Sequence, residues 1–135
     1  MLAGVRSEAT FISIRQVLQD TVPYKNSYID FFPNLQVSYP LTEKLPAQFS
    51  YSRRITRPSY GQLDPSFNFS DPQNIHRGNP YLMPEMTHSL ELTIMPVIKT
   101  MQLQSSVYYK YSENTITRFR KQVTGDISQI TYENA

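Results

Sequence analysis

The side chains best suited to chemistry lie in the segment 57–85, which contains five of the ten prolines in the chain. Its aromatic rings can stack on a flat or sugar-like ligand, and its cationic and imidazole groups can donate hydrogen bonds to that ligand. Such a set suits noncovalent ligand binding; the alternative is that the rings pack the segment against its own surroundings. The candidate ligand-binding residues are Tyr60, Phe67, Phe69, His76, Arg77 and Tyr81.

Patterns for catalysis and metal binding are weak. The sequence has no Gly-x-Ser-x-Gly elbow, no glycine-rich phosphate loop and no cysteine nucleophile. Asp64, Asp71 and Glu85 share the same segment, but their spacing fixes no distance between the carboxylates. His76 and His88 lack the close spacing of a metal-binding motif. We therefore predict no enzymatic activity, no cofactor and no metal site.

Composition excludes several classes of protein. Ten Tyr and seven Phe in 135 residues are too many aromatics for a disordered chain. A net charge of +2 is too small to argue for nucleic acid, so no nucleic-acid partner is predicted. The most basic run, 117–122, is interpreted as a strand end exposed to water. No run approaches the roughly 18 apolar residues of a membrane helix, and "MLAGV", followed by charged Arg6 and Glu8, is no signal peptide.

Strands dominate the hydropathy pattern. Four segments alternate apolar and polar residues with a period of two, which predicts strands with one apolar and one polar face. In the first, for example, Leu35 and Val37 share one face while Gln36 and Ser38 share the other. The segment 11–20 reads either as a short helix or as more strand. The predicted strands are 32–41, 47–55, 88–96 and 100–112, with weaker candidates at 1–10 and a hairpin of 115–123 with 126–134.

The predicted connections alternate in length. Short turns at 40–46 and 96–100 contrast with long connections at 13–30 and 56–86. Long loops are uncommon in compact domains, whereas outer-membrane barrels carry short turns on one side and long loops on the other. The alternative is a soluble antiparallel sandwich. Because the polar faces are rich in Gln, Ser and Thr, we predict an all-β antiparallel meander of about six to seven strands, a partial transmembrane β-barrel with long extracellular loops.

The stretches "FFPNLQVSYPLTEKLPAQFSYSRRITRPSYGQLDP" and "GNPYLMPEMTHSLEL" resemble the outer-membrane β-barrel segment of TonB-dependent receptor-like proteins of the Bacteroidetes type. The resemblance implies a large barrel in the bacterial outer membrane, a plug domain inside it, and nutrient import driven by TonB. The resemblance rests on the order and spacing of a set of landmarks. These are Phe32-Pro33, Tyr51-Ser52-Arg53-Arg54, Arg57-Pro58, Gly78-Asn79-Pro80, Pro84-Glu85 and the terminal "TYEN".

Six or seven strands are too few to enclose a wide lumen, because barrel diameter grows with strand number. We therefore expect residues 1–135 to be a partial barrel domain, a fragment that takes part in ligand capture and nutrient uptake in the intact receptor. The expected partners are outer-membrane lipid, the plug domain and TonB of the intact receptor, and an unknown nutrient ligand. The alternative function is a soluble β-rich module that binds carbohydrate or protein.

The run "YSRRI" is expected to mark the outer end of a spanning strand. Tyr51 would join an aromatic girdle on the lipid face. Arg54 would share the hydrated lumen face with Ser52, and Arg53 would lie at or beyond the membrane interface. Residues 57–85 would then form an extracellular loop that its prolines stiffen into turns. We expect Gly78 in this loop to adopt a positive φ before the Asn-Pro step.

Overall fold

The computed structural model of the chain describes residues 1–15, 24–71, 73–124 and 127–135. These residues form strands almost throughout, with one short helix, and no described helix is long and apolar enough to cross a membrane. The Cα positions divide the chain into two compact units. The first comprises Met1–Glu8, Asp30–Arg54 and Thr87–Ser112, and the second Ala9–Ile29, Ile55–Met86 and Glu113–Ala135.

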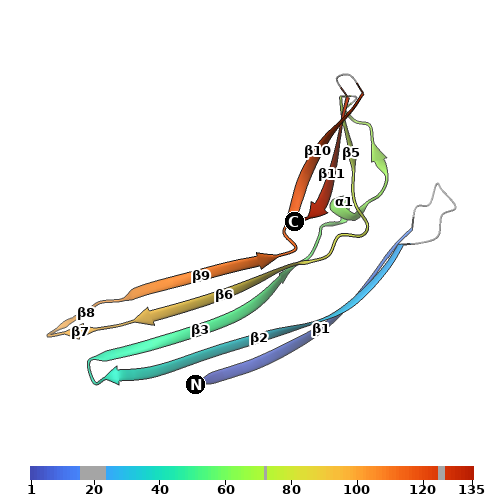
Figure 1. Cartoon of the computed structure of the whole chain (residues 1–135). Helices are drawn as coiled ribbons and strands as arrows, with labels where there is room; N and C mark the ends of the chain where they lie inside the picture. The colour runs from blue at the N-terminus through green and yellow to red at the C-terminus, as the bar shows by residue number, and fades with distance from the viewer. Residues whose placement is uncertain (16–23, 72, 125–126) are drawn as a thin grey trace. The chain divides into compact units, whose positions relative to one another are not determined.

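Five long strands form one sheet in the order β1-β2-β3-β6-β9, which Figure 1 shows side by side. Their bounds are β1 (Leu2–Ile14), β2 (Tyr24–Thr42), β3 (Leu45–Thr56), β6 (Glu85–Ile94) and β9 (Ser105–Glu113). With β10 and β11, described below, the described residues form seven long strands, so the predicted all-β fold is confirmed. The predicted loop 13–30 is wrong at both ends, because β1 extends to Ile14 and β2 begins at Tyr24. Of the ambiguous segment 11–20, the first four residues are strand, and 16–20 lie outside the described residues.

Register explains why the two faces of this sheet differ. β2 and β3 pair antiparallel across a two-residue turn, with Leu35 opposite Tyr51 and Val37 opposite Phe49. Directly opposite residues lie on the same face of a sheet, so the apolar side chains of both strands form one face. The predicted faces and the short turn are therefore confirmed here. On the polar face lie the pairs Asn34–Ser52, Gln36–Ser50 and Ser38–Gln48.

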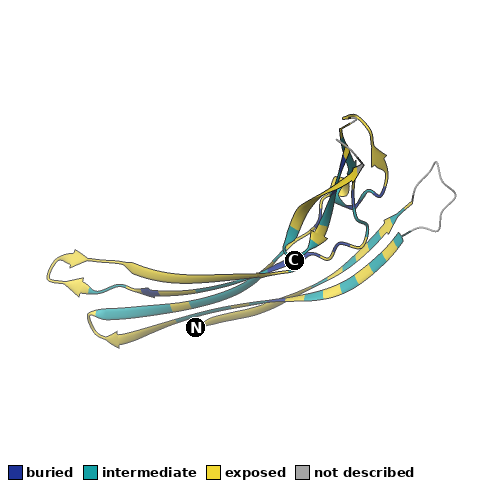
Figure 2. Cartoon of the chain, turned by 45° about the horizontal axis from the view of Figure 1, so that its top comes forward, coloured by how far each residue is buried: buried dark blue, intermediate teal, exposed yellow. Residues whose placement is uncertain are grey.

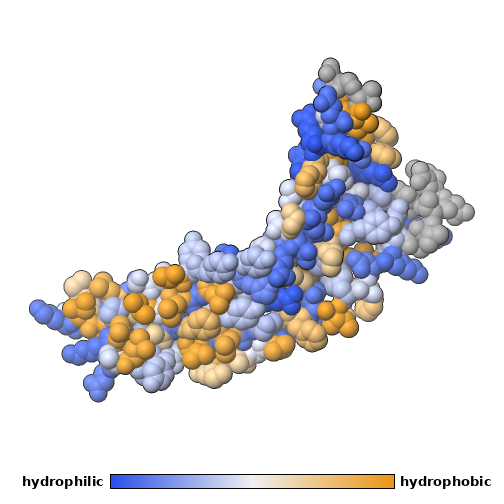
Figure 3. Space-filling view, in the orientation of Figure 1, coloured by the Kyte–Doolittle hydropathy of each residue, from blue (hydrophilic) through white to orange (hydrophobic). Residues whose placement is uncertain are grey.

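The same division continues in β6 and β9. Hydroxyl hydrogen bonds join Thr87 to Ser112 at 3.0 Å and Thr93 to Ser106 at 2.8 Å, so these polar residues share one face. In β6 Leu92 and Ile94 are exposed and Leu90 is half-buried, and β9 is exposed along its whole length (Figure 2). Figure 3 shows apolar side chains gathered over this part of the chain. An apolar face left open in this way requires a nonaqueous neighbour.

The single strand predicted over 100–112 is interrupted. Met101–Gln102 forms β8 and pairs with β7 (Val97–Ile98) in a tight hairpin, and β9 starts only at Ser105. Lys99 takes the left-handed conformation, with φ of 56°, that such a two-residue turn requires. The Leu103 amide donates to the Pro96 carbonyl at 3.0 Å and closes the hairpin. The turn thus extends further than alternation alone indicated.

The second unit contains a four-stranded sheet in the order β10-β11-β5-β4, together with helix α1 (Tyr60–Leu63). β10 (Ile116–Thr124) and β11 (Ile127–Asn134) form the predicted antiparallel hairpin, whose tip at 125–126 lies outside the described residues. β4 (Phe67–Asn68) and β5 (Asn74–Arg77) come from the segment predicted to be a loop, and β5 pairs with β11 in parallel. The loop is therefore a folded element, and the meander is not purely antiparallel.

Aliphatic residues and prolines, not aromatics, form the core of this unit. Leu82 is only 1% exposed, and the other buried apolar residues of the unit include none of its Tyr or Phe. The prolines add apolar volume and restrict the backbone at the same positions. The buried apolar side chains are Pro58, Leu63, Pro65, Leu82, Pro84, Met86 and Ile130.

Gly78 is required for a reason different from the predicted one. Its φ lies outside the positive range, so the expectation of a left-handed turn is wrong. An added Cβ would lie 2.5 Å from the Asp64 carbonyl oxygen and 2.7 Å from that of Gln62. Gly78 donates its amide to Asp64 at 2.8 Å, and the next amide, of Asn79, donates to Gln62 at 2.7 Å. These two hydrogen bonds hold the backbone after β5 close to the end of α1, and this close approach leaves no room for a Cβ at Gly78.

Candidate functional site

The predicted ligand-binding aromatics all lie on the surface of the second unit. Tyr60, Phe67, Phe69 and Tyr81 are between 50% and 75% exposed. The aliphatic core of this unit does not include these rings. Ligand binding by the rings, and the alternative that they pack the loop against its neighbours, both stay predictions.

Phe67, Phe69 and Arg77 form one cluster. The two phenyl rings stack with centroids 5.8 Å apart and an interplanar angle of 25°. The Arg77 guanidinium carbon lies 4.8 Å from the Phe67 ring centroid, and its Nε donates to the Pro65 carbonyl at 3.2 Å. β4 and β5 position the cluster by placing Phe67 directly opposite Arg77. The result is a fixed, exposed platform of two rings and one cation.

Tyr60 and His76 line an adjacent cleft of about 430 Å³. α1 brings Tyr60 to this cleft, and Ser59 begins the helix with its amide donating to Gln62 Oε1 at 2.8 Å. His76 comes from β5, opposite Asn68 of β4. The wall is otherwise polar and suits hydrogen bonding to a hydroxylated or amide-bearing ligand. The further lining residues are Ser59, Gly61, Gln62, Asp64, Ser66, Asn68, Arg77, Gly78 and Tyr132.

Tyr81 does not join either group. Its ring packs edge-on against Tyr24 of β2, with centroids 5.4 Å apart, and its amide donates to Asn79 Oδ1 at 3.0 Å. Asn79 in turn donates from Nδ2 to the Tyr132 carbonyl at 3.0 Å. Of the six predicted residues, five are therefore gathered around α1, β4 and β5, and Tyr81 stands apart.

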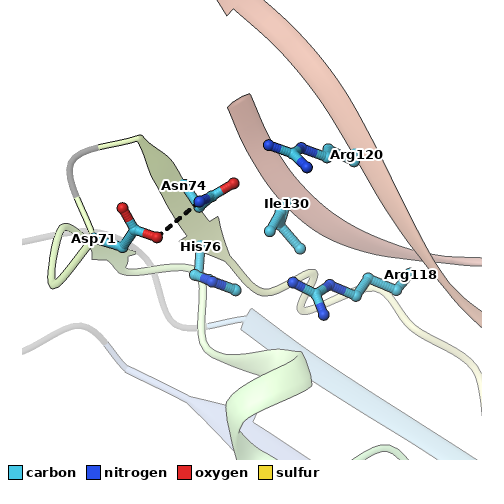
Figure 4. A pocket seen from close by; sticks show the side chains of 6 residues that line it. All are labelled: Asp71, Asn74, His76, Arg118, Arg120 and Ile130. Carbon is cyan, nitrogen blue, oxygen red and sulfur yellow. Dashed lines mark hydrogen bonds between the residues drawn. The ribbon is translucent and has the colours of Figure 1, made fainter. Parts of the chain in front are cut away.

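His76 also lines a second cleft, of about 460 Å³. Figure 4 shows the residues around this second cleft. Arg118 and Arg120 of β10 line it together with the buried Ile130. Sequence reasoning missed these two arginines as site residues, because it treated the basic run as an exposed strand end. The signal was available, since residues two apart on a strand point to the same face. The sequence did not show that β5 joins the same sheet as β10, with β11 between the two strands.

Asp71 and Asn74 complete this second cleft, outside the long strands that carry the apolar face. Asn74 Nδ2 donates to Asp71 Oδ2 at 2.7 Å, and the Gln73 amide donates to Oδ1 at 2.9 Å. The Asn74 side chain first, and then the Gln73 amide, lower the pKa of Asp71 below its ordinary value by stabilising the charged carboxylate. Both oxygens of this carboxylate are therefore engaged by its own turn.

The structure gives the positions of the residues that were expected to mark the outer end of a strand. Tyr51 lies on the apolar face, and its hydroxyl is 2.8 Å from Nδ1 of His88. Arg53 is half-buried and donates from Nη1 to the Phe31 carbonyl at 3.1 Å, while Arg54 is exposed. A guanidinium on an apolar face is less costly when a backbone carbonyl accepts a hydrogen bond from it. Over the described parts of the chain, no group of three or more His, Asp or Glu could hold a metal ion.

Comparison with known proteins agrees with this architecture. The model of the outer membrane protein beta-barrel family matches residues 1–135. Among solved structures, the chain is similar to a double mutant of the Serratia marcescens hemophore receptor HasR in complex with its hemophore HasA and heme. That similarity has a TM-score of 0.61 and 14% sequence identity over 98% of this chain and 25% of HasR. No curated protein matches the sequence.

The chain spans about a quarter of the length of HasR, and at 14% identity the likeness shows a shared fold. The open apolar face, the polar opposite face and the family match agree with one another. The predicted resemblance to outer-membrane barrels is thereby confirmed. The chain belongs to the outer membrane protein beta-barrel family and resides in the outer membrane.

Proposed function

We propose that this chain forms part of the wall of an outer-membrane receptor, and that the segment 57–85 captures a nutrient ligand for uptake. The role is noncovalent and non-enzymatic: the strands supply a lipid-facing wall, and the loop between β3 and β6 supplies the ligand contacts. In the intact protein, the proposed partners are outer-membrane lipid, a plug domain and TonB. HasR, the similar structure, is a hemophore receptor in complex with HasA and heme, which supports a receptor role.

The observation that carries this proposal is the exposure of the loop aromatics above a complete aliphatic core. Phe67 and Phe69 stack on each other and hold Arg77 against one ring, yet these phenyl rings stay half or more exposed. Exposed apolar surface costs about 25 cal/mol per Å² relative to burial. A ligand that covers the rings recovers this free energy and adds stacking worth about 0.5–1.5 kcal/mol per aromatic pair.

The test uses the intact protein that carries this chain, in its own outer membrane. A deletion strain is first screened on single glycans and chelated iron sources, to find a nutrient whose uptake requires the protein. The double variant Phe67→Ser, Phe69→Ser is then compared with Phe119→Ser, which removes a partly exposed ring from β10 outside the loop. The loop variant should lower uptake at limiting nutrient by about tenfold.

The control variant should transport normally, and both variants should reach the outer membrane in wild-type amounts. Wild-type uptake by the double variant would contradict ligand capture by this cluster. Uptake that needs the protein but not the cluster would leave the barrel assignment intact and would move the capture site elsewhere.

A further inference from the structure

We propose that the cleft between β5 and β10 is an anion-binding site, in which Arg118 and Arg120 bind the carboxylate or phosphate group of a small organic ligand. The site lies beside the aromatic cluster but uses different side chains. It does not depend on the nutrient-capture role proposed above, since anion binding can be measured without any uptake.

Register brings the two arginines and His76 to one face of the four-stranded sheet. Arg120 pairs with Ile130, and Ile130 pairs with His76 on the next strand. Arg118 lies two residues before Arg120 and therefore on the same face, about 7 Å away along the strand. Figure 4 shows both guanidiniums and the imidazole around the same open space, with Ile130 between them.

The charges of this cleft favour an anion. Within the described chain, neither the Arg118 nor the Arg120 guanidinium has a hydrogen-bond or salt-bridge partner. The one carboxylate among the lining residues is Asp71, whose two oxygens already accept from Gln73 and Asn74. The cleft is therefore lined by two guanidiniums and by one carboxylate, and both oxygens of that carboxylate already accept hydrogen bonds within its own turn.

The side chains that line the cleft indicate the chemical class of the ligand. A guanidinium presents a planar fork of donors that matches a carboxylate or phosphate in bidentate geometry. Ile130, 3% exposed, gives an apolar floor between the arginines and His76, which suits the carbon skeleton of an organic acid or a phosphate ester. His76 and Asn74 add polar groups that can bind hydroxyls. A phosphorylated or acidic sugar combines these three features.

The experiment measures binding of glucose 6-phosphate to the intact detergent-solubilised protein by calorimetry, with glucose as the neutral comparison. Arg118→Gln and Arg120→Gln each remove one charge from the cleft. Lys121→Gln removes the same charge from the same strand, but its position alternates with Arg120 and lies on the opposite face. All three side chains are exposed, so these substitutions should leave the fold unchanged.

Each arginine variant should weaken binding of glucose 6-phosphate by about three- to tenfold, and Lys121→Gln by less than about twofold. Raising NaCl from about 0.1 to about 0.5 M should also weaken it, because an open cleft is screened by salt. Glucose should bind far more weakly than its phosphate ester. Lysine at position 118 or 120 should retain part of the affinity, since the charge remains and the fork is lost.

A second arm separates a soluble ligand from a lipid phosphate. Vesicles that contain phosphatidic acid compete with glucose 6-phosphate if the arginines face membrane phosphates, and they leave its binding unchanged if the natural ligand is a solute. Competition that disappears in Arg118→Gln and Arg120→Gln supports the site with a lipid source. No binding of either probe up to about 10 mM, or an equal loss in Lys121→Gln, would overturn the proposal.

Discussion

Gly78 carries a constraint that composition could not reveal. A Cβ at this position would overlap the backbone of Asp64 and Gln62, and backbone atoms cannot swing aside as a flexible side chain can. Gly78→Ala should therefore destabilise the 57–85 loop by about 1–3 kcal/mol, as overpacking does in well-packed regions. The readout is the proteolysis rate of the loop in the detergent-solubilised protein.

Gly61→Ala is the matched control for this prediction. It lies in α1, where nothing comes within 4 Å of an added Cβ, and alanine favours helix by up to about 1 kcal/mol over glycine. The control should leave the loop as protected as the wild type, or more so. Equal protection in the two variants would mean that the junction between α1 and β5 relaxes without cost.

Asp71 gives the loop a defined pH dependence. Since the fold lowers the pKa of this carboxyl, the charged form is favoured in the folded state. The stabilisation is then complete above the unfolded pKa of about 3.9 and is lost as pH falls through the lower folded value. An NMR titration of the Gln73 amide shift should show a midpoint below about 3.9. Asp71→Asn should abolish that titration, and a midpoint at or above the ordinary value would contradict the turn geometry.

At the scale of elements, the strands of the long sheet were predictable and the folded loop was not. Alternation in a strand reports directly which side chains share a face, so the division at Leu35 and Gln36 follows from the sequence alone. The loop strands are short and pair with partners distant in the chain, since β5 lies beside β11. Such pairing leaves no local period, which is why Arg118 and His76 could not be placed together in advance.

The two faces of β2 make a sharp prediction at this scale. Val37 lies on the apolar face opposite Phe49, and Gln36 lies on the polar face opposite Ser50. Val37→Arg should destabilise the membrane-embedded protein by up to about 2–4 kcal/mol, with the full cost at the bilayer midplane. Gln36→Arg, one residue away, should change stability far less because its charge stays hydrated. Denaturant unfolding in lipid vesicles measures both, and similar losses would contradict the assignment of faces.

At the scale of the whole chain, the open surfaces explain why the fold suits a membrane. β1 and β9 are the outermost strands of the long sheet, and unpaired edges tend to associate. The apolar face adds residues such as Tyr39 at 65% and Val107 at 72% exposure. A soluble sandwich would bury such a face under a second sheet, so the uncovered surface accounts for the outer-membrane location in physical terms.

The same surfaces predict how residues 1–135 partition when produced alone. In plain buffer the chain should aggregate, because the apolar face and both sheet edges would meet water. Detergent micelles or vesicles should instead hold it dispersed with a strand-rich circular dichroism spectrum, since lipid tails cover the apolar face. Sedimentation with and without detergent measures the difference. A monodisperse monomer in buffer would require a cover for Tyr39 and Val107 that the described chain lacks, and would contradict a lipid-facing wall.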